Sequence, residues 1–114
     1  HVNTVIFDEI DTGLSGKVLQ SMRDKLAALA LSHQILCITH QPILASVADN
    51  HVFVSKQQTS ESTHLSATTL DAPERLRAVA EMASGQGDHE TSINFARALV
   101  ADAQKVKDAL LHSR

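Results

Sequence analysis

Two short apolar segments, Val2–Phe7 and Gln34–Thr39, constrain the fold of this chain more than any other feature. Both are rich in β-branched residues and are short, which indicates buried strands. Between them, Lys17–Leu31 carries apolar residues at helical spacing, namely Val18, Met22, Leu26 and Leu29. Two buried strands joined by a helix are typical of parallel neighbours with a right-handed crossover. The sequence therefore predicts an α/β fold.

A β-hairpin is expected after a short helical turn. The turn is predicted at Gln41–Ala48, where Pro42 is tolerated in the first turn of a helix. The hairpin strands are predicted at His51–Ser55 and Thr63–Leu70, and the polar run Lys56–Ser62 is predicted to be the loop between them.

Two helices are expected in the C-terminal part. Asp71, followed three residues later by Glu74, has the layout of a capping box. The helix that it opens is predicted to present Leu76, Val79, Ala80 and Ala83 to the core. Gly85 and Gly87 interrupt the chain before a last helix, predicted at about Asp88–His112. The apolar face of that helix comprises Ile93, Ala96, Leu99, Val100, Ala103, Val106 and Leu110.

Composition narrows the class of protein. A chain of 114 residues suits one domain. Its formal charge of −3, with both signs interspersed, gives no basic stripe for direct nucleic-acid binding. A single cysteine, Cys37, excludes a disulfide framework within the chain and is expected to be a core residue in a reducing compartment. No apolar run approaches the ~20 residues that span a bilayer. The chain does not begin with Met, so we expect a segment of a longer protein.

Polar residues follow both predicted parallel strands. Asp8 and Glu9 end the first, and His40 ends the second. Carboxyl ends of parallel strands collect functional groups at one sheet edge, so these side chains are expected to lie together. Such a set suits a nucleotide hydrolase. The Asp would hold Mg²⁺, directly or through water, the Glu would polarise the attacking water, and the His would contact the γ-phosphate.

The same residues carry a resemblance to a known family. Thr4–Glu9 resembles the Walker B motif of the ABC-type ATPases, Thr12–Ser15 their D-loop, and Ile38–His40 their switch histidine. Within that superfamily, the runs FDEIDTGLSG, CITHQPILASVAD and HVFVSK resemble the RecN family of bacterial SMC-like DNA-repair proteins. The resemblance continues through Glu74–Leu99 and thus covers nearly the whole chain.

The resemblance implies specific roles. Asp8 would be the Mg²⁺-associated acid, Glu9 the general base and His40 the switch histidine. Three D-loop residues would lie at the ATP site and the interface between two heads, namely Asp11, Gly13 and Ser15. Ser15 departs from the Asp that many ABC proteins have there, which leaves the hydrogen bonding of the D-loop open.

The resemblance also implies that this is half of a P-loop NTPase head. No GxxxxGK[ST] phosphate loop and no LSGGQ-like signature occur in the sequence. Residues 1–114 would then be the C-terminal lobe of an ABC-type head, without the N-terminal lobe or the coiled coil, and inactive alone. The expected cofactors are ATP and Mg²⁺. The expected partners are the N-terminal lobe, a second head in a homodimer and, through the complete protein, DNA in the bacterial cytoplasm and nucleoid.

Simpler interpretations stay open beside these. Asp8 and Glu9 could be a solvated strand end, and His40 a surface histidine like the other histidines of the chain, which lack metal-ligand spacing. The whole chain could also be a non-catalytic dimerisation or regulatory module with the same fold. Retention of both carboxylates and the histidine favours the ATPase.

Overall fold

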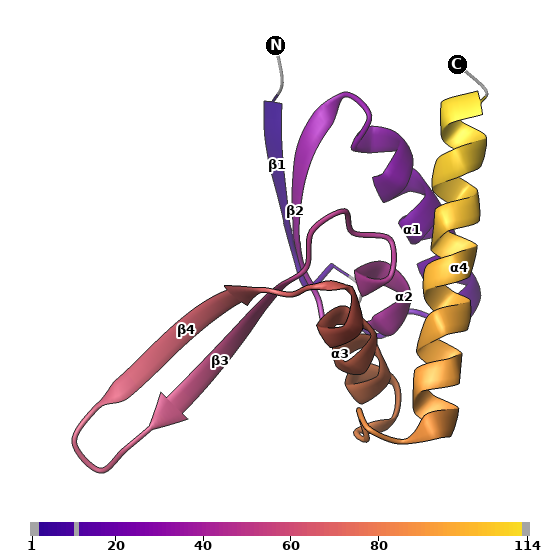
Figure 1. Ribbon diagram of the computed structural model, residues 1–114. Helices are drawn as coiled ribbons and strands as arrows, with labels where there is room; N and C mark the ends of the chain where they lie inside the picture. Colours follow the sequence, from indigo (N-terminus) through magenta and orange to yellow (C-terminus); the bar gives the residue numbers. More distant parts are fainter. Residues whose placement is uncertain (1–2, 11, 113–114) are drawn as a thin grey trace.

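The described part of the chain folds into a mixed α/β unit of two small sheets and four helices (Figure 1). The computed structural model describes residues 3–10 and 12–112. The elements in chain order are β1 (Asn3–Asp8), α1 (Gly16–Leu29), β2 (His33–Ile38), α2 (Pro42–Ala45), β3 (Val52–Gln58), β4 (Thr63–Thr69), α3 (Ala72–Ser84) and α4 (Glu90–His112). This order confirms the coarse prediction of parallel strands with a crossover helix, a hairpin and C-terminal helices.

Strands β1 and β2 form the predicted parallel pair. Their register runs from Asn3 opposite His33 to Asp8 opposite Ile38. Helix α1 covers one face of the pair, where its buried leucines pack against partly buried strand residues. The strand residues in that cluster are Phe7, Ile35 and Cys37. The prediction that Cys37 packs in the core is therefore confirmed.

The opposite face of the β1–β2 pair is open. Ile6 is 63% exposed, Leu36 48% and Ile38 54%. The prediction of fully buried strands is therefore wrong for this face, because Figure 1 places the helices on the other side and no described element covers it. Three large apolar side chains facing water indicate a surface that a further layer of protein would bury.

The buried face of α1 agrees with the predicted one in part. Leu26 is buried and Met22 packs against the core as predicted, but Leu19 and Arg23 are also buried, whereas Val18 is 46% exposed. The helical spacing of Leu19, Met22 and Leu26 is as good as that of the predicted stripe, so periodicity alone did not separate two overlapping faces. The buried Arg23 donates from Nε to Oδ1 of Asp24 at 3.0 Å.

Small side chains let α2, α3 and α4 pack closely. Ala45, Val79, Ala80 and Ala96 form their common core, and the neighbouring Leu44 of α2 packs instead into the cluster beneath α1. Helix α2 thus joins the two cores.

The predicted core positions of α3 and α4 are largely confirmed, since Val79, Ala80, Ala96 and Ala103 are buried. Ala83 is exposed, contrary to prediction. Helix α3 ends one residue later, and Met82 packs against the core instead.

Both ends of α3 are fixed by local chemistry. The side chain of Asp71 accepts a hydrogen bond from the Glu74 N–H at 2.9 Å, and the Asp71 N–H donates to Glu74 Oε1 at 3.0 Å. This confirms the capping box. Gly85 ends the helix with φ +75°, a left-handed conformation that glycine adopts without steric cost.

The β3–β4 hairpin projects away from the helices (Figure 1). Its register runs from Val52 opposite Thr69 to Gln58 opposite Thr63. The predicted loop was too long, because residues 56–58 are paired and only residues 59–62 form the turn. One face of this ribbon carries the exposed side chains of Val52, Val54 and Leu65. An isolated two-stranded ribbon is marginally stable in water. A partner that packs on the apolar face of this hairpin would therefore stabilise it.

Within residues 3–10 and 12–112, no helix has the length and apolar character needed to cross a bilayer.

Candidate active site

The two predicted functional strand ends lie side by side. Asp8 is opposite Ile38 in the ladder, and the N–H of Glu9 donates to the carbonyl of Ile38 at 2.8 Å. His40 follows two residues later, and its Nδ1 lies 3.3 Å from Oε1 of Glu9. The expected meeting of carboxylate and imidazole at one sheet edge is therefore found.

This Glu9–His40 contact is exposed. The side chains are 55% and 68% accessible, respectively, so an ion pair here contributes no more than about 1 kcal/mol to stability. The contact therefore contributes little to the stability of the fold. Its value is that it shows the Glu9 carboxylate and the His40 imidazole to lie side by side.

Glu9 has an unusual backbone. Its φ of +51° makes it a non-glycine residue in the left-handed region, a conformation that costs about 1–3 kcal/mol. Asp8 is still in the strand and, by strand alternation, lies on the open face with Ile6. The left-handed turn at Glu9 breaks that alternation. The Glu9 carboxylate contacts His40, whereas Asp8 continues the exposed face of the strand.

The loop after Glu9 contains the other predicted site residues. The Thr12 hydroxyl donates to the Glu9 carbonyl at 3.1 Å. Gly13 has φ +78° and is exposed, so a side chain would be strained there. Ser15 is the N-cap of α1, where its hydroxyl makes no capping hydrogen bond and its carbonyl accepts from the Leu19 N–H at 2.9 Å. Asp11, also predicted to belong to the site, lies outside the described residues.

The segment after His40 is held by two sets of hydrogen bonds. The Gln41 N–H donates to the Thr39 hydroxyl at 3.0 Å, immediately before α2. At the other end of α2, the guanidinium of Arg75 donates to the carbonyls of Ala45 and Ser46, each at 3.1 Å, and also to that of Ala48. Arg75 thus binds carbonyls at the C-terminal end of α2, where helical carbonyls lack intrahelical partners; that of Ala45 also accepts from the Ala48 N–H at 3.4 Å.

Sequence reasoning missed Arg75 and misplaced His51. Nothing in the local pattern distinguishes Arg75 from the other arginines, because its acceptors come from a distant turn. His51 was predicted to lie on the surface, but it is only 9% exposed. Burial is the main cause that lowers the pKa of His51, and the nearby Arg75 charge lowers it further. Burial also lowers the pKa of Arg75.

Asp8 is compatible with Mg²⁺ as a single protein ligand. Among the described residues, no group of three or more acidic, histidine or cysteine side chains could hold a metal ion by itself. Mg²⁺ usually keeps several waters and is bound by one or two carboxylates together with substrate phosphates. One exposed carboxylate at a strand end fits that mode.

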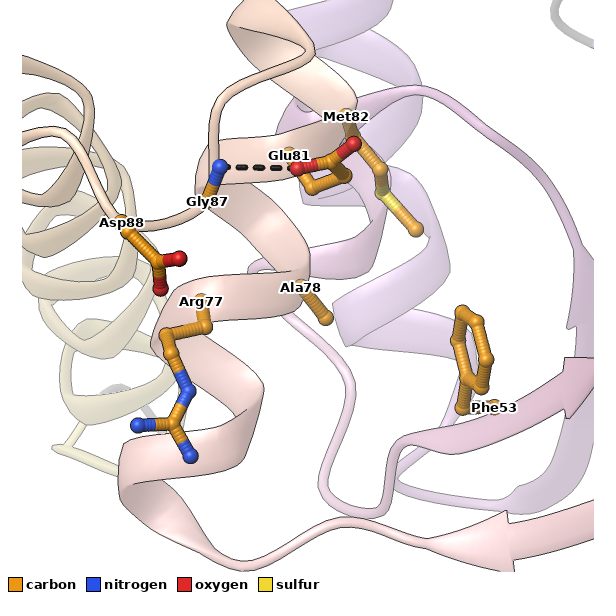
Figure 2. A pocket seen from close by; sticks show the side chains of 7 residues that line it. All are labelled: Phe53, Arg77, Ala78, Glu81, Met82, Gly87 and Asp88. Carbon is orange, nitrogen blue, oxygen red and sulfur yellow. Dashed lines mark hydrogen bonds between the residues drawn. The ribbon is translucent and has the colours of Figure 1, made fainter.

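Two hollows of the surface lie elsewhere. Figure 2 shows one of about 380 Å³, where Phe53 of β3 faces Ala78 and Met82 of α3. At its far side the Gly87 N–H donates to Glu81 at 2.7 Å.

A second hollow, of about 540 Å³, is lined by residues that include His51, Arg75 and Arg97. Neither hollow includes Asp8, Glu9 or His40. The candidate site is instead an open edge.

Comparison with known proteins identifies the relationship. No family model matches the chain. DNA repair protein RecN of Bacillus subtilis is 33% identical over 106 residues, which are 93% of this chain and 18% of that protein. RecN of Treponema pallidum is 38% identical over 99 residues, 87% of this chain and 17% of that protein. RecN of Synechocystis sp. is 40% identical over 107 residues, 94% of this chain and 18% of that protein. The chain is therefore a homologue of a segment of the DNA repair protein RecN, a segment that makes up less than one fifth of these relatives.

Proposed function

We propose that this chain is the C-terminal lobe of an ATP-hydrolysing head in a RecN-like DNA repair protein. The observation that carries the proposal is the contact between Glu9 and His40 at the carboxyl ends of the parallel strands β1 and β2. This edge is where open α/β sheets bind their ligands. The homology to RecN supports the role in DNA repair.

Each group at the edge has a distinct role in the proposal. Mg²⁺ associated with Asp8, directly or through water, would neutralise charge on the phosphates. Glu9 accepts a proton from the attacking water as general base. His40 approaches Glu9 with Nδ1, which leaves the Nε2 side of its ring for the γ-phosphate. Asp11, Gly13 and Ser15 are proposed to lie at the ATP site between two heads.

The rest of the head would come from other parts of the protein. The open face of Ile6, Leu36 and Ile38 suits cover by an N-terminal lobe that supplies the phosphate loop. Such cover is also favoured because, within residues 3–10 and 12–112, β1 and β2 form a sheet of only two strands, each of them an edge strand. A second head in a homodimer is the other proposed partner, and DNA would be bound by the complete protein, in the bacterial cytoplasm.

The test is Glu9→Gln in the complete protein. Loss of a general base typically slows a reaction ~10²–10⁴-fold, so steady-state turnover of ATP should fall by that factor while ATP binding persists. Glu61→Gln, the same change on the exposed hairpin turn, is the matched control. Turnover within a few-fold of the parent in Glu9→Gln would refute the general-base role. Absence of ATP binding in the parent protein would favour a non-catalytic dimerisation or regulatory module.

A further inference from the structure

Three contacts fix the position of Glu9. Its N–H donates to the carbonyl of Ile38 at 2.8 Å, and its carboxylate lies 3.3 Å from His40. On the other side of the residue, its carbonyl accepts the hydroxyl hydrogen of Thr12 at 3.1 Å. The first two contacts come from the β2 end, whereas the third comes from the loop that follows Glu9 itself.

The contact from Thr12 acts where the backbone is strained. A glutamate in the left-handed region persists only when its surroundings hold it there. If the Glu9 carbonyl were released, the peptide after it could rotate and φ and ψ of Glu9 could relax toward the ordinary extended or helical regions. That relaxation would swing the Cα–Cβ bond and carry the carboxylate away from His40.

We propose that Thr12 is a positioning residue for ATP hydrolysis, and that its hydroxyl holds the left-handed turn that keeps the Glu9 carboxylate beside His40. The inference rests on the proposed function, in which Glu9 is the general base. Thr12 itself touches no reacting atom in this scheme. It acts by keeping the base within hydrogen-bond reach of the attacking water, a requirement that general-base catalysis imposes on geometry.

The expected effect is specific to the chemical step. Thr12→Val removes the hydroxyl but keeps the branched shape, whereas Thr12→Ser keeps the hydroxyl. A single exposed hydrogen bond contributes only a modest net free energy to holding Glu9 in place. In the complete protein, Thr12→Val should therefore lower kcat by roughly tenfold. The KM for ATP should change less than about twofold, because the hydroxyl acts on the base and not on nucleotide binding. Thr12→Ser should restore most of kcat.

The hairpin offers a matched control. Thr59 donates its hydroxyl to the carbonyl of Ser62, also across three residues and also at 3.1 Å. Thr59→Val therefore removes the same kind of hydrogen bond, and also the acceptor of the Ser62 N–H, far along the chain from the candidate site. It should leave kcat within about twofold of the parent.

A double-mutant comparison separates positioning from a general structural defect. If Thr12 acts through Glu9, then Thr12→Val should have almost no further effect on turnover in a Glu9→Gln background. The inference would be overturned if Thr12→Val lowered turnover equally in both backgrounds. It would also be overturned if Thr12→Val abolished ATP binding, or if Thr12→Ser were as slow as Thr12→Val. An unchanged kcat in Thr12→Val together with stalled Glu9→Gln would overturn it while the proposed function stands. Undiminished turnover in Glu9→Gln would instead refute the proposed function.

Discussion

Glu9 and His40 meet across the end of a two-stranded parallel sheet, with Oε1 of one 3.3 Å from Nδ1 of the other. Strand register brings these two side chains together, because β1 and β2 align Asp8 with Ile38 and leave Glu9 and His40 at the same edge.

The first prediction concerns His40. The γ-phosphate offers its ring a partner that ADP lacks, so His40→Ala in the complete protein should lower turnover more than ADP affinity. Loss of a donor to developing charge typically costs about 10²-fold in kcat. Steady-state kinetics and ADP binding measure the two effects, with the exposed His112→Ala as control. Equal losses of turnover and ADP affinity would indicate a folding defect and would refute the proposed contact of His40 with the γ-phosphate.

The second prediction concerns the open face of the β1–β2 pair. We expect the isolated 114-residue chain to aggregate, swap or pair with itself, because its free strand edges and apolar face invite association. Light scattering after size-exclusion chromatography measures this. A cooperatively melting monomer that binds no N-terminal lobe would contradict the half-head proposal.

A substitution on that face sharpens the test. Leu36→Ser should reduce self-association of the isolated chain, because Leu36 is 48% exposed there. The same substitution should destabilise the complete protein by about 2–3 kcal/mol if the N-terminal lobe buries the leucine. Ser60→Ala on the exposed hairpin turn is the control. An equal, small effect in both settings would show that the face stays open.

The third prediction concerns pH and His51. Its pKa in the folded chain lies below the ordinary value of 6.5, mainly because of burial. Below pH 6.5 the unfolded chain therefore binds more protons than the folded one, and the free energy of unfolding falls as the pH is lowered. Well above pH 6.5 both states are neutral at this site and the effect vanishes.

Hydrogen exchange of residues 45–51 in the complete protein measures this, after correction for intrinsic rates. Protection should decline as the pH falls from about 6.5 to about 5, and His51→Gln should flatten that decline. A parent protein whose protection is constant over this range would contradict the prediction.

The fourth prediction concerns the capping box of α3. Asp71→Ala leaves the Glu74 N–H without its acceptor, and loss of such a cap typically costs about 1 kcal/mol. Exchange protection in the first turn of α3 should fall accordingly, by roughly fivefold. Glu61→Ala, an acid-to-alanine change away from helix ends, should have no effect there. Unchanged protection in Asp71→Ala would mean that packing alone fixes the helix start.

The sequence by itself determined the features that depend on near neighbours. The capping box of Asp71 and Glu74 and the interruption at Gly85 were predicted from residues a few positions apart. The parallel pairing of β1 with β2 was predicted from two apolar segments joined by a helix and the connection rule for such strands. The candidate edge was also predictable, because connection rules for parallel strands place Glu9 and His40 together.

Only the tertiary structure decided which of several equally plausible residues are buried and which long-range contacts form. Leu19 and not Val18 is buried on α1, because the position of β1, β2 and α2 selects between two helical faces of similar spacing. His51 is buried and Arg75 binds the end of α2, since their partners lie far away in the chain. Burial and long-range hydrogen bonds depend on how whole helices and strands pack together, and local residue patterns do not predict that packing.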